Sequence, residues 1–191
     1  MSEFPTSADD ATAALVYTSS MGSTDRCSAL LSTATEETTI LWVTYTTPPS
    51  DCIEQYREAG GVGSLSIIAV GDMPTDTPDD ATDVTVKSVS TPDDLTGLGI
   101  TLSQALSTHE DPLVCFDSLS VLLQYVDRET AYEFLNAVTG HLYAADATAH
   151  FHLDPSAHDR ATVDALASLF DAVAEREDGG WAVREREFLH P

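Results

Sequence analysis

The sequence is short of basic residues. Lysine and arginine together number 8, against 32 aspartates and glutamates, which gives a formal net charge of -24. Lys87 is its single lysine, and the nearest approach to a basic cluster, Arg176, Arg184 and Arg186, is interspersed with glutamates. Because proteins contact nucleic-acid phosphates through clustered lysines and arginines, this composition argues against a nucleic-acid partner.

The chain also lacks long apolar runs and several catalytic signatures. No apolar run approaches the ~18 residues that indicate a transmembrane helix, and no basic segment followed by an apolar one marks a secretory signal at the N-terminus. The motifs G-x-S-x-G and H-E-x-x-H are absent, so neither an activated serine nor a zinc-protease site is predicted. We expect a cytoplasmic protein without a membrane partner.

Cysteine is scarce as well. Cys27, Cys52 and Cys115 are far apart, odd in number and without a C-x-x-C spacing, which suits a reducing cytosol. Cys115 lies in an apolar run and is expected to be a small buried residue. Cys27 falls near a predicted helix N-terminus, a place that can lower the pKa of a thiol. With no particular histidine to pair with it, Cys27 is not expected to be catalytic.

Acidic residues, by contrast, are spread along the whole chain between clear apolar segments. The apolar fraction of 42% is ordinary for a globular domain, so the pattern indicates a folded domain with an acidic surface rather than an acidic tail. High aspartate, threonine and alanine with almost no lysine resembles the cytosolic proteins of salt-accumulating haloarchaea. The alternative is an acidic protein with a basic partner.

Apolar and β-branched segments alternate with amphipathic ones along the chain. After a polar lead-in over 1–11, the length suits a single α/β domain over 12–191. Strands are predicted near 13–18, 39–45, 64–72, 84–90, 111–118, 147–154 and 181–187. Helices are predicted near 22–35, 50–60, 92–110 and 156–178, with a short and a longer one within 119–146. This alternation favours a three-layer, doubly wound, mostly parallel sheet with helices on both faces.

Residues 15–31, "LVYTSSMGSTDRCSALL", have the strand, turn and helix outline of a phosphate-binding loop. Such a loop follows the pattern GxxxxGK[ST]. Aligned on the inner glycine of that loop, the positions are filled by Ser19, Gly22, Thr24, Asp25 and Arg26. A carboxylate, Asp25, replaces the required lysine, and Arg26 replaces the hydroxyl that holds Mg²⁺. We therefore expect neither a bound nucleotide nor another cofactor at this loop.

Two further segments carry a family resemblance. "ILWVTYTTPPSDCIEQYREAG" resembles the second strand and following helix of KaiC-like and other RecA-superfamily ATPases, and "DPLVCFDSLSVLLQYVD" resembles their Walker B segment. The order of the later helices and strands fits as well, so the resemblance covers roughly residues 12 to 187. It implies a RecA/KaiC-like ATP-binding fold, often assembled in rings or filaments.

The resemblance also implies roles for individual positions. Asp117 and Ser118 match the Walker B position, where the aspartate orients Mg²⁺, and Thr46 and Thr47 replace the acidic pair that activates water. Without the lysine, the Mg²⁺ hydroxyl and the general base, the chain is expected to be a pseudo-ATPase with no catalytic residues. Asp117 remains either a polar anchor at a strand end or a residual ligand; the resemblance places it beside the turn at 19–23.

The segment "HFHLDPSAHD" offers a weak metal candidate. His150 and His152 share one face of a predicted strand and Asp154 follows it. Histidine and aspartate can bind Zn²⁺, but polar residues are common at the ends of strands, and we expect structural or surface residues here rather than a metal site.

We expect a catalytically inactive RecA/KaiC-like domain that acts as a regulatory or scaffold protein. Its partner is expected to be another copy of itself or an active KaiC-like ATPase. The alternative is a sensor domain that binds a small molecule or nucleotide at the carboxyl edge of the sheet without hydrolysing it.

Overall fold

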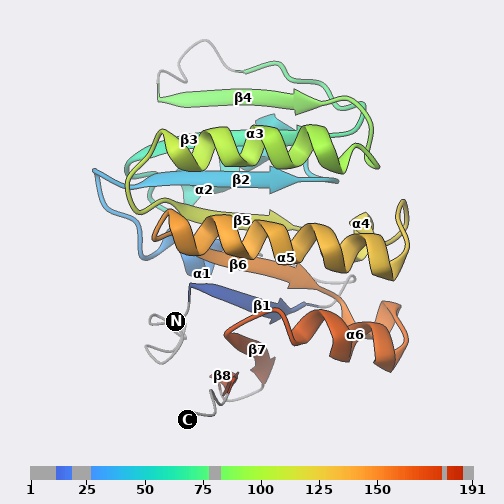
Figure 1. Ribbon diagram of the computed structural model, residues 1–191. Helices are drawn as coiled ribbons and strands as arrows, with labels where there is room; N and C mark the ends of the chain where they lie inside the picture. The colour runs from blue at the N-terminus through green and yellow to red at the C-terminus, as the bar shows by residue number, and fades with distance from the viewer. Residues whose placement is uncertain (1–11, 19–26, 78–82, 178–179, 187–191) are drawn as a thin grey trace.

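The computed structural model describes residues 12–18, 27–77, 83–177 and 180–186, which build one eight-stranded sheet (Figure 1). The strands are β1 (Ala13–Tyr17), β2 (Thr39–Thr44), β3 (Ser64–Val70), β4 (Val84–Val89), β5 (Leu113–Asp117), β6 (Thr148–Leu153), β7 (Ala172–Glu177) and β8 (Gly180–Glu185). Their order is β4-β3-β2-β5-β6-β1-β7-β8. All neighbours pair in parallel except β7 and β8, which pair antiparallel.

Helices cover both faces of this sheet (Figure 1). The helices are α1 (Ser28–Leu31), α2 (Pro49–Glu58), α3 (Leu95–Ser107), α4 (Leu119–Leu122), α5 (Arg128–Ala144) and α6 (Arg160–Ala167), with a 3₁₀ turn, η2 (Pro155–Ala157). Helices α3, α5 and α6 pack on one face and contribute to the larger core, whereas α1 and α2 pack on the other face over a smaller core. The predicted doubly wound, three-layer α/β architecture is confirmed. No helix in the described ranges is long and apolar enough to span a membrane.

The central strands form because their sequences are apolar on both faces. All six residues of β2 are buried, and four of the five in β5 are. Val114 and Phe116 of β5 face the larger core, while Leu113 and Cys115 face the smaller one. Strand β4 lies at one edge of the sheet. Asp117 ends β5 at the carboxyl edge.

The predicted helix over 156–178 is wrong in its second half. Helix α6 ends at Ala167, and Ala172–Glu177 form β7 instead. The apolar spacing that suggested one long helix includes Leu166 and Phe170, which are both buried. Leu166 lies on α6, but Phe170 lies in the turn that follows it. β7 lies between β1 and β8, so two hydrogen-bonded ladders stabilise it, and the small buried side chains of Ala172 and Ala174 fit between its neighbours. Tertiary pairing overrides local helical spacing here.

The predicted first helix is also shorter than expected. Within the described part of the predicted range, the chain is helical over Ser28–Leu31, and residues 22–26 lie outside the described residues. The remaining predicted elements agree with the structure to within a few residues.

Two places at the carboxyl edge of the sheet are suited to binding. The chain leaves β1 towards α1 on one face but leaves its neighbour β6 towards α6 on the other. The neighbours β2 and β5 diverge in the same way, towards α2 and α5. In parallel α/β sheets, ligands bind in the crevices that open at such points.

Candidate functional site

At the end of β2, the side chain of Thr44 forms two hydrogen bonds with the backbone of the turn that follows. Thr44 Oγ1 accepts a hydrogen bond from the backbone N–H of Thr47 at 3.0 Å and donates one to the Thr47 carbonyl at 2.9 Å. Thr46 and Thr47 thus form a tight turn that leads into α2. The resemblance places a water-activating carboxylate at this turn, and a threonine hydroxyl is not a general base at neutral pH.

Asp117, at the end of β5, is buried and anchored. Its side chain is 4% exposed, and its carbonyl accepts a hydrogen bond of 2.9 Å from Tyr45 N. The Asp117–Ser118 peptide bond is cis, and the Ser118 side chain accepts a hydrogen bond from Val121 N as the N-cap of α4. The turn at 19–23, beside which Asp117 was predicted to lie, is outside the described residues, as are Ser19, Gly22, Thr24, Asp25 and Arg26.

Asp154, at the end of β6, caps the turn that follows it. Its Oδ1 accepts hydrogen bonds from Ser156 N at 2.9 Å and Ser156 Oγ at 2.6 Å. Its own N–H donates to Ser120 Oγ at 2.8 Å, which ties β6 to α4. These hydrogen bonds give Asp154 a structural role, because they fix the turn that follows β6 and attach β6 to α4.

The two histidines of β6 lie inside the protein. His150 and His152 are 5% and 0% exposed, on the face of the sheet that α1 covers. His150 lies opposite Cys115 in the β5–β6 ladder. Burial, and then the neighbouring His152, lowers the pKa of His150 to about 3, so His150 is neutral. The two histidines are therefore not surface residues.

The structure brings together three residues that no sequence motif pairs. Cys27, immediately before α1, and Cys115 on β5 form a disulfide, with Cα atoms 6.1 Å apart and a separation of 88 positions in the sequence. His152 Nε2 lies 3.9 Å from Cys27 Sγ. The prediction that Cys115 is buried is confirmed. The sequence singled out no particular histidine as a partner for Cys27, and the structure places His152 beside it, because β6 lies between β1 and β5.

The third cysteine, Cys52, lies on the inner side of α2, where its Sγ donates a hydrogen bond of 3.7 Å to the Thr47 carbonyl. Cys52 is fully buried. Burial, followed by the nearby carboxylates of Asp117 and Asp51, raises the pKa of its thiol to about 12. A thiol in this state is a poor nucleophile.

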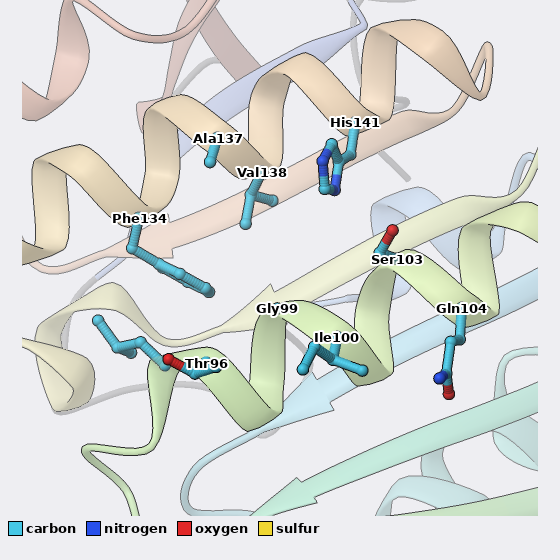
Figure 2. Close-up of a pocket in the computed structure, with 10 residues that line it drawn as sticks. Thr96, Gly99, Ile100, Ser103, Gln104, Phe134, Ala137, Val138 and His141 are labelled. Carbon is cyan, nitrogen blue, oxygen red and sulfur yellow. The ribbon is translucent and has the colours of Figure 1, made fainter.

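A separate feature lies on the opposite face of the molecule, between α3 and α5. A groove of about 410 Å³ runs between the two helices, lined among others by Leu95, Gly99 and Ile100 of α3 and by Phe134, Val138 and His141 of α5 (Figure 2). Ile100 is 55% exposed. None of the lining residues is acidic, although acidic residues are spread over the rest of the sequence.

Sequence reasoning missed this groove, although a signal was present. Helix α3, "LTGLGITLSQALS", contains no charged residue over its 13 positions, whereas 21% of the whole chain is charged. A helix without charge in so acidic a protein was the signal in the sequence for this groove.

Comparison with known proteins places the chain in a family and supports its fold. The model of a family of unknown function, DUF7504, matches residues 11–176. A solved structure from Pyrococcus horikoshii OT3, described as a "Structural study of Project ID PH0250", is similar with a TM-score of 0.57 at 14% identity, covering 94% of this chain and 88% of that one. At this identity the likeness concerns the fold alone. A search of curated proteins finds no match.

Proposed function

The chain belongs to the DUF7504 family, and we propose that it is a catalytically inactive RecA/KaiC-like domain that regulates or scaffolds a protein partner in a halophilic cytosol. The observation that carries the proposal is the uncharged groove between α3 and α5. The hydrogen bonding of the strand ends supports its non-catalytic character.

The carboxyl edge is built from groups that hold the fold. Thr44 binds back to Thr47, Asp154 caps η2 and Ser118 caps α4. In a RecA-like ATPase the end of the second strand supplies the general base, and here that turn contains threonines. Removing a general base typically costs a factor of 10² to 10⁴ in rate, and the phosphate loop has also lost its lysine.

The groove has the composition of a protein-binding surface. Exposed apolar area rimmed by polar residues is typical of interaction sites. Ile100 and Phe134 project from the two facing helices (Figure 2), and the hydroxyl and amide groups of Thr96, Ser103 and Gln104 line the groove beside them. An apolar side chain of a partner can enter between the helices without desolvating a carboxylate.

The partner is another copy of this chain or an active KaiC-like ATPase. A net charge of -24 repels a second acidic protein at low salt, but the Debye length shrinks to about 3 Å at 1 M salt. Contact through an uncharged groove is therefore compatible with two acidic partners in a salt-rich cytosol.

The test compares two apolar-to-acidic substitutions in molar KCl. Ile100→Asp places a carboxylate in the groove, whereas Val62→Asp places one at an exposed valine outside it. Sedimentation equilibrium measures self-association, and calorimetry measures binding to a purified KaiC-like ATPase from the same cells. We expect one of the two associations in the wild type, weakened at least ~10-fold by Ile100→Asp, which is about 1.4 kcal/mol, and unchanged by Val62→Asp. Absence of both associations in the wild type contradicts the proposal.

A second candidate function is the sensing of a small molecule or nucleotide. The observation that favours it is the strand topology, in which β1 and β6, and likewise β2 and β5, lead to helices on opposite faces of the sheet. A ligand that binds only the folded state raises its stability by RT ln(1 + [L]/Kd). A thermal-shift screen of nucleotides and metabolites in molar KCl tests this alternative, and a saturable shift that survives Ile100→Asp would favour it over partner binding.

A further inference from the structure

We propose that Cys27, Cys115 and His152, in their reduced form, are the ligands of one thiophilic d¹⁰ metal ion, Zn²⁺ or Cu⁺. Their candidate ligand atoms, two Sγ atoms and one imidazole nitrogen, all lie within 4.8 Å of one another. Each residue comes from a different part of the fold: the segment before α1, β5 and β6.

The donor atoms determine the class of ion. Two thiolates and an imidazole are soft or borderline ligands, which select Zn²⁺ or Cu⁺ over the oxygen-seeking Mg²⁺ and Ca²⁺. A Zn–S bond of about 2.3 Å in tetrahedral geometry places two sulfurs about 3.8 Å apart. Once the disulfide is opened, the two sulfurs must move apart to about this separation to bind one ion.

Because the three residues are buried, a metal site with no net charge is favoured here. Cys27, Cys115 and His152 are at most 1% exposed, and they adjoin the apolar core that includes Leu30, Ile40 and Trp42. Two thiolates with one Zn²⁺ and a neutral imidazole carry no net charge, which limits the cost of burial. His152 Nε2 already lies 3.9 Å from Cys27 Sγ, so the imidazole is in place to ligate an ion held by the two sulfurs.

Disulfide and metal site are alternative states of the same two sulfurs. A phosphine or dithiol reductant supplies two electrons, the S–S bond breaks, and each sulfur takes up a proton. Zn²⁺ then displaces the two thiol protons as two Zn–S bonds form, with His152 as a neutral ligand. The ion links α1 to the two strands beneath it, as the disulfide does in the oxidised state.

The test uses the full chain, reduced by a phosphine under anaerobic conditions in molar KCl. Co²⁺ serves as a coloured substitute for Zn²⁺, because thiolate ligation gives charge-transfer absorption that carboxylates do not. We expect one Co²⁺ per chain with this absorption, displaced by one Zn²⁺, and a rise in melting temperature at saturating Zn²⁺. A parallel titration with Cu⁺ against a chromophoric chelator shows which of the two ions binds more tightly.

The variants are Cys27→Ser, Cys115→Ser and His152→Gln, with Cys52→Ser as the matched control. We expect each ligand substitution to weaken binding at least ~10-fold while the control binds as the wild type does, with folding checked by circular dichroism. If a ligand variant fails to fold, alkylation of the reduced wild type replaces it, and the metal must then protect two thiols. The proposal is overturned if reduced wild type binds neither ion, if Co²⁺ binds without thiolate absorption, or if Cys52→Ser weakens binding as much as the ligand variants do.

Discussion

Two buried tyrosines differ in what their hydroxyl groups contact. Tyr56 donates a hydrogen bond of 2.8 Å to the Gly63 carbonyl. The Tyr45 hydroxyl is buried against Phe116 with no hydrogen-bond partner among the described residues, and burial raises its pKa. Tyr45→Phe should raise the free energy of unfolding by about 1 kcal/mol, whereas Tyr56→Phe should lower it by about 1 kcal/mol. Denaturant midpoints in molar KCl measure both, and equal destabilisation by the two substitutions would contradict this account.

The three cysteines should differ sharply in reactivity. With a pKa of about 12, Cys52 is thiolate in only about one molecule in 10⁴ at pH 8. In protein purified in air, iodoacetamide should label no cysteine in the native state, one after denaturation and all three after denaturation with reductant. Mass spectrometry counts the labels. Three labels in denatured, unreduced protein would show that Cys27 and Cys115 are not bonded.

Individual contacts of this kind were the least predictable part of the molecule. His152 and Cys27 are 125 positions apart, and they meet only because β6 lies between β1 and β5. Periodicity places His150 and His152 on one face of a strand but does not say which strand lies beside it. The sequence therefore indicates candidate ligands without revealing their neighbours.

At the scale of elements, two aspartates cap helices through their charged form. Asp127 accepts a hydrogen bond from Thr130 N at the start of α5, and Asp159 accepts hydrogen bonds from Thr162 Oγ1 and N at the start of α6. These hydrogen bonds lower the pKa of both carboxyls from 3.8. Because the folded-state pKa is depressed, the stabilisation is present above the unfolded-state pKa and is lost as pH falls through the folded-state pKa.

The pH dependence can be isolated by amide substitution. The pair Asp127→Asn and Asp159→Asn keeps the capping oxygens but removes their titration. Between about pH 5 and about pH 2.5, the melting temperature of this variant should fall less than that of the wild type. Glu36→Gln with Glu37→Gln, at exposed loop positions, controls for the loss of two negative charges. An equal pH dependence in all three proteins would show that the caps do not titrate as described.

Elements buried on both faces were predictable, and those defined by their neighbours were not. β2 and β5 could be predicted because their sequences are almost continuously apolar or β-branched. β7 was predicted as helix because its alternating alanines carry little signal until β1 and β8 lie on either side. The α3 side of the groove showed in the sequence only as an absence of charge.

For the whole molecule, charge dominates the expected behaviour. A net charge of -24 destabilises the compact state by self-repulsion, which salt screens. The melting temperature should rise strongly from dilute buffer to molar KCl. Sucrose at matched osmolality, which does not screen charge, should produce a much smaller rise. A melting temperature that is flat in KCl would remove the halophilic interpretation.

The central claim is that this fold is used without nucleotide turnover, and titration with Mg-ATP tests it most directly. Calorimetry and a phosphate-release assay on the wild type in molar KCl should show neither micromolar binding nor steady release. On the proposed RecA-like alignment, the turn after β2 has threonines at the position of the general base, and Asp25 occupies the position of the lysine. Micromolar binding or steady phosphate release that disappears in Asp117→Ala would contradict the claim and identify the protein as an enzyme.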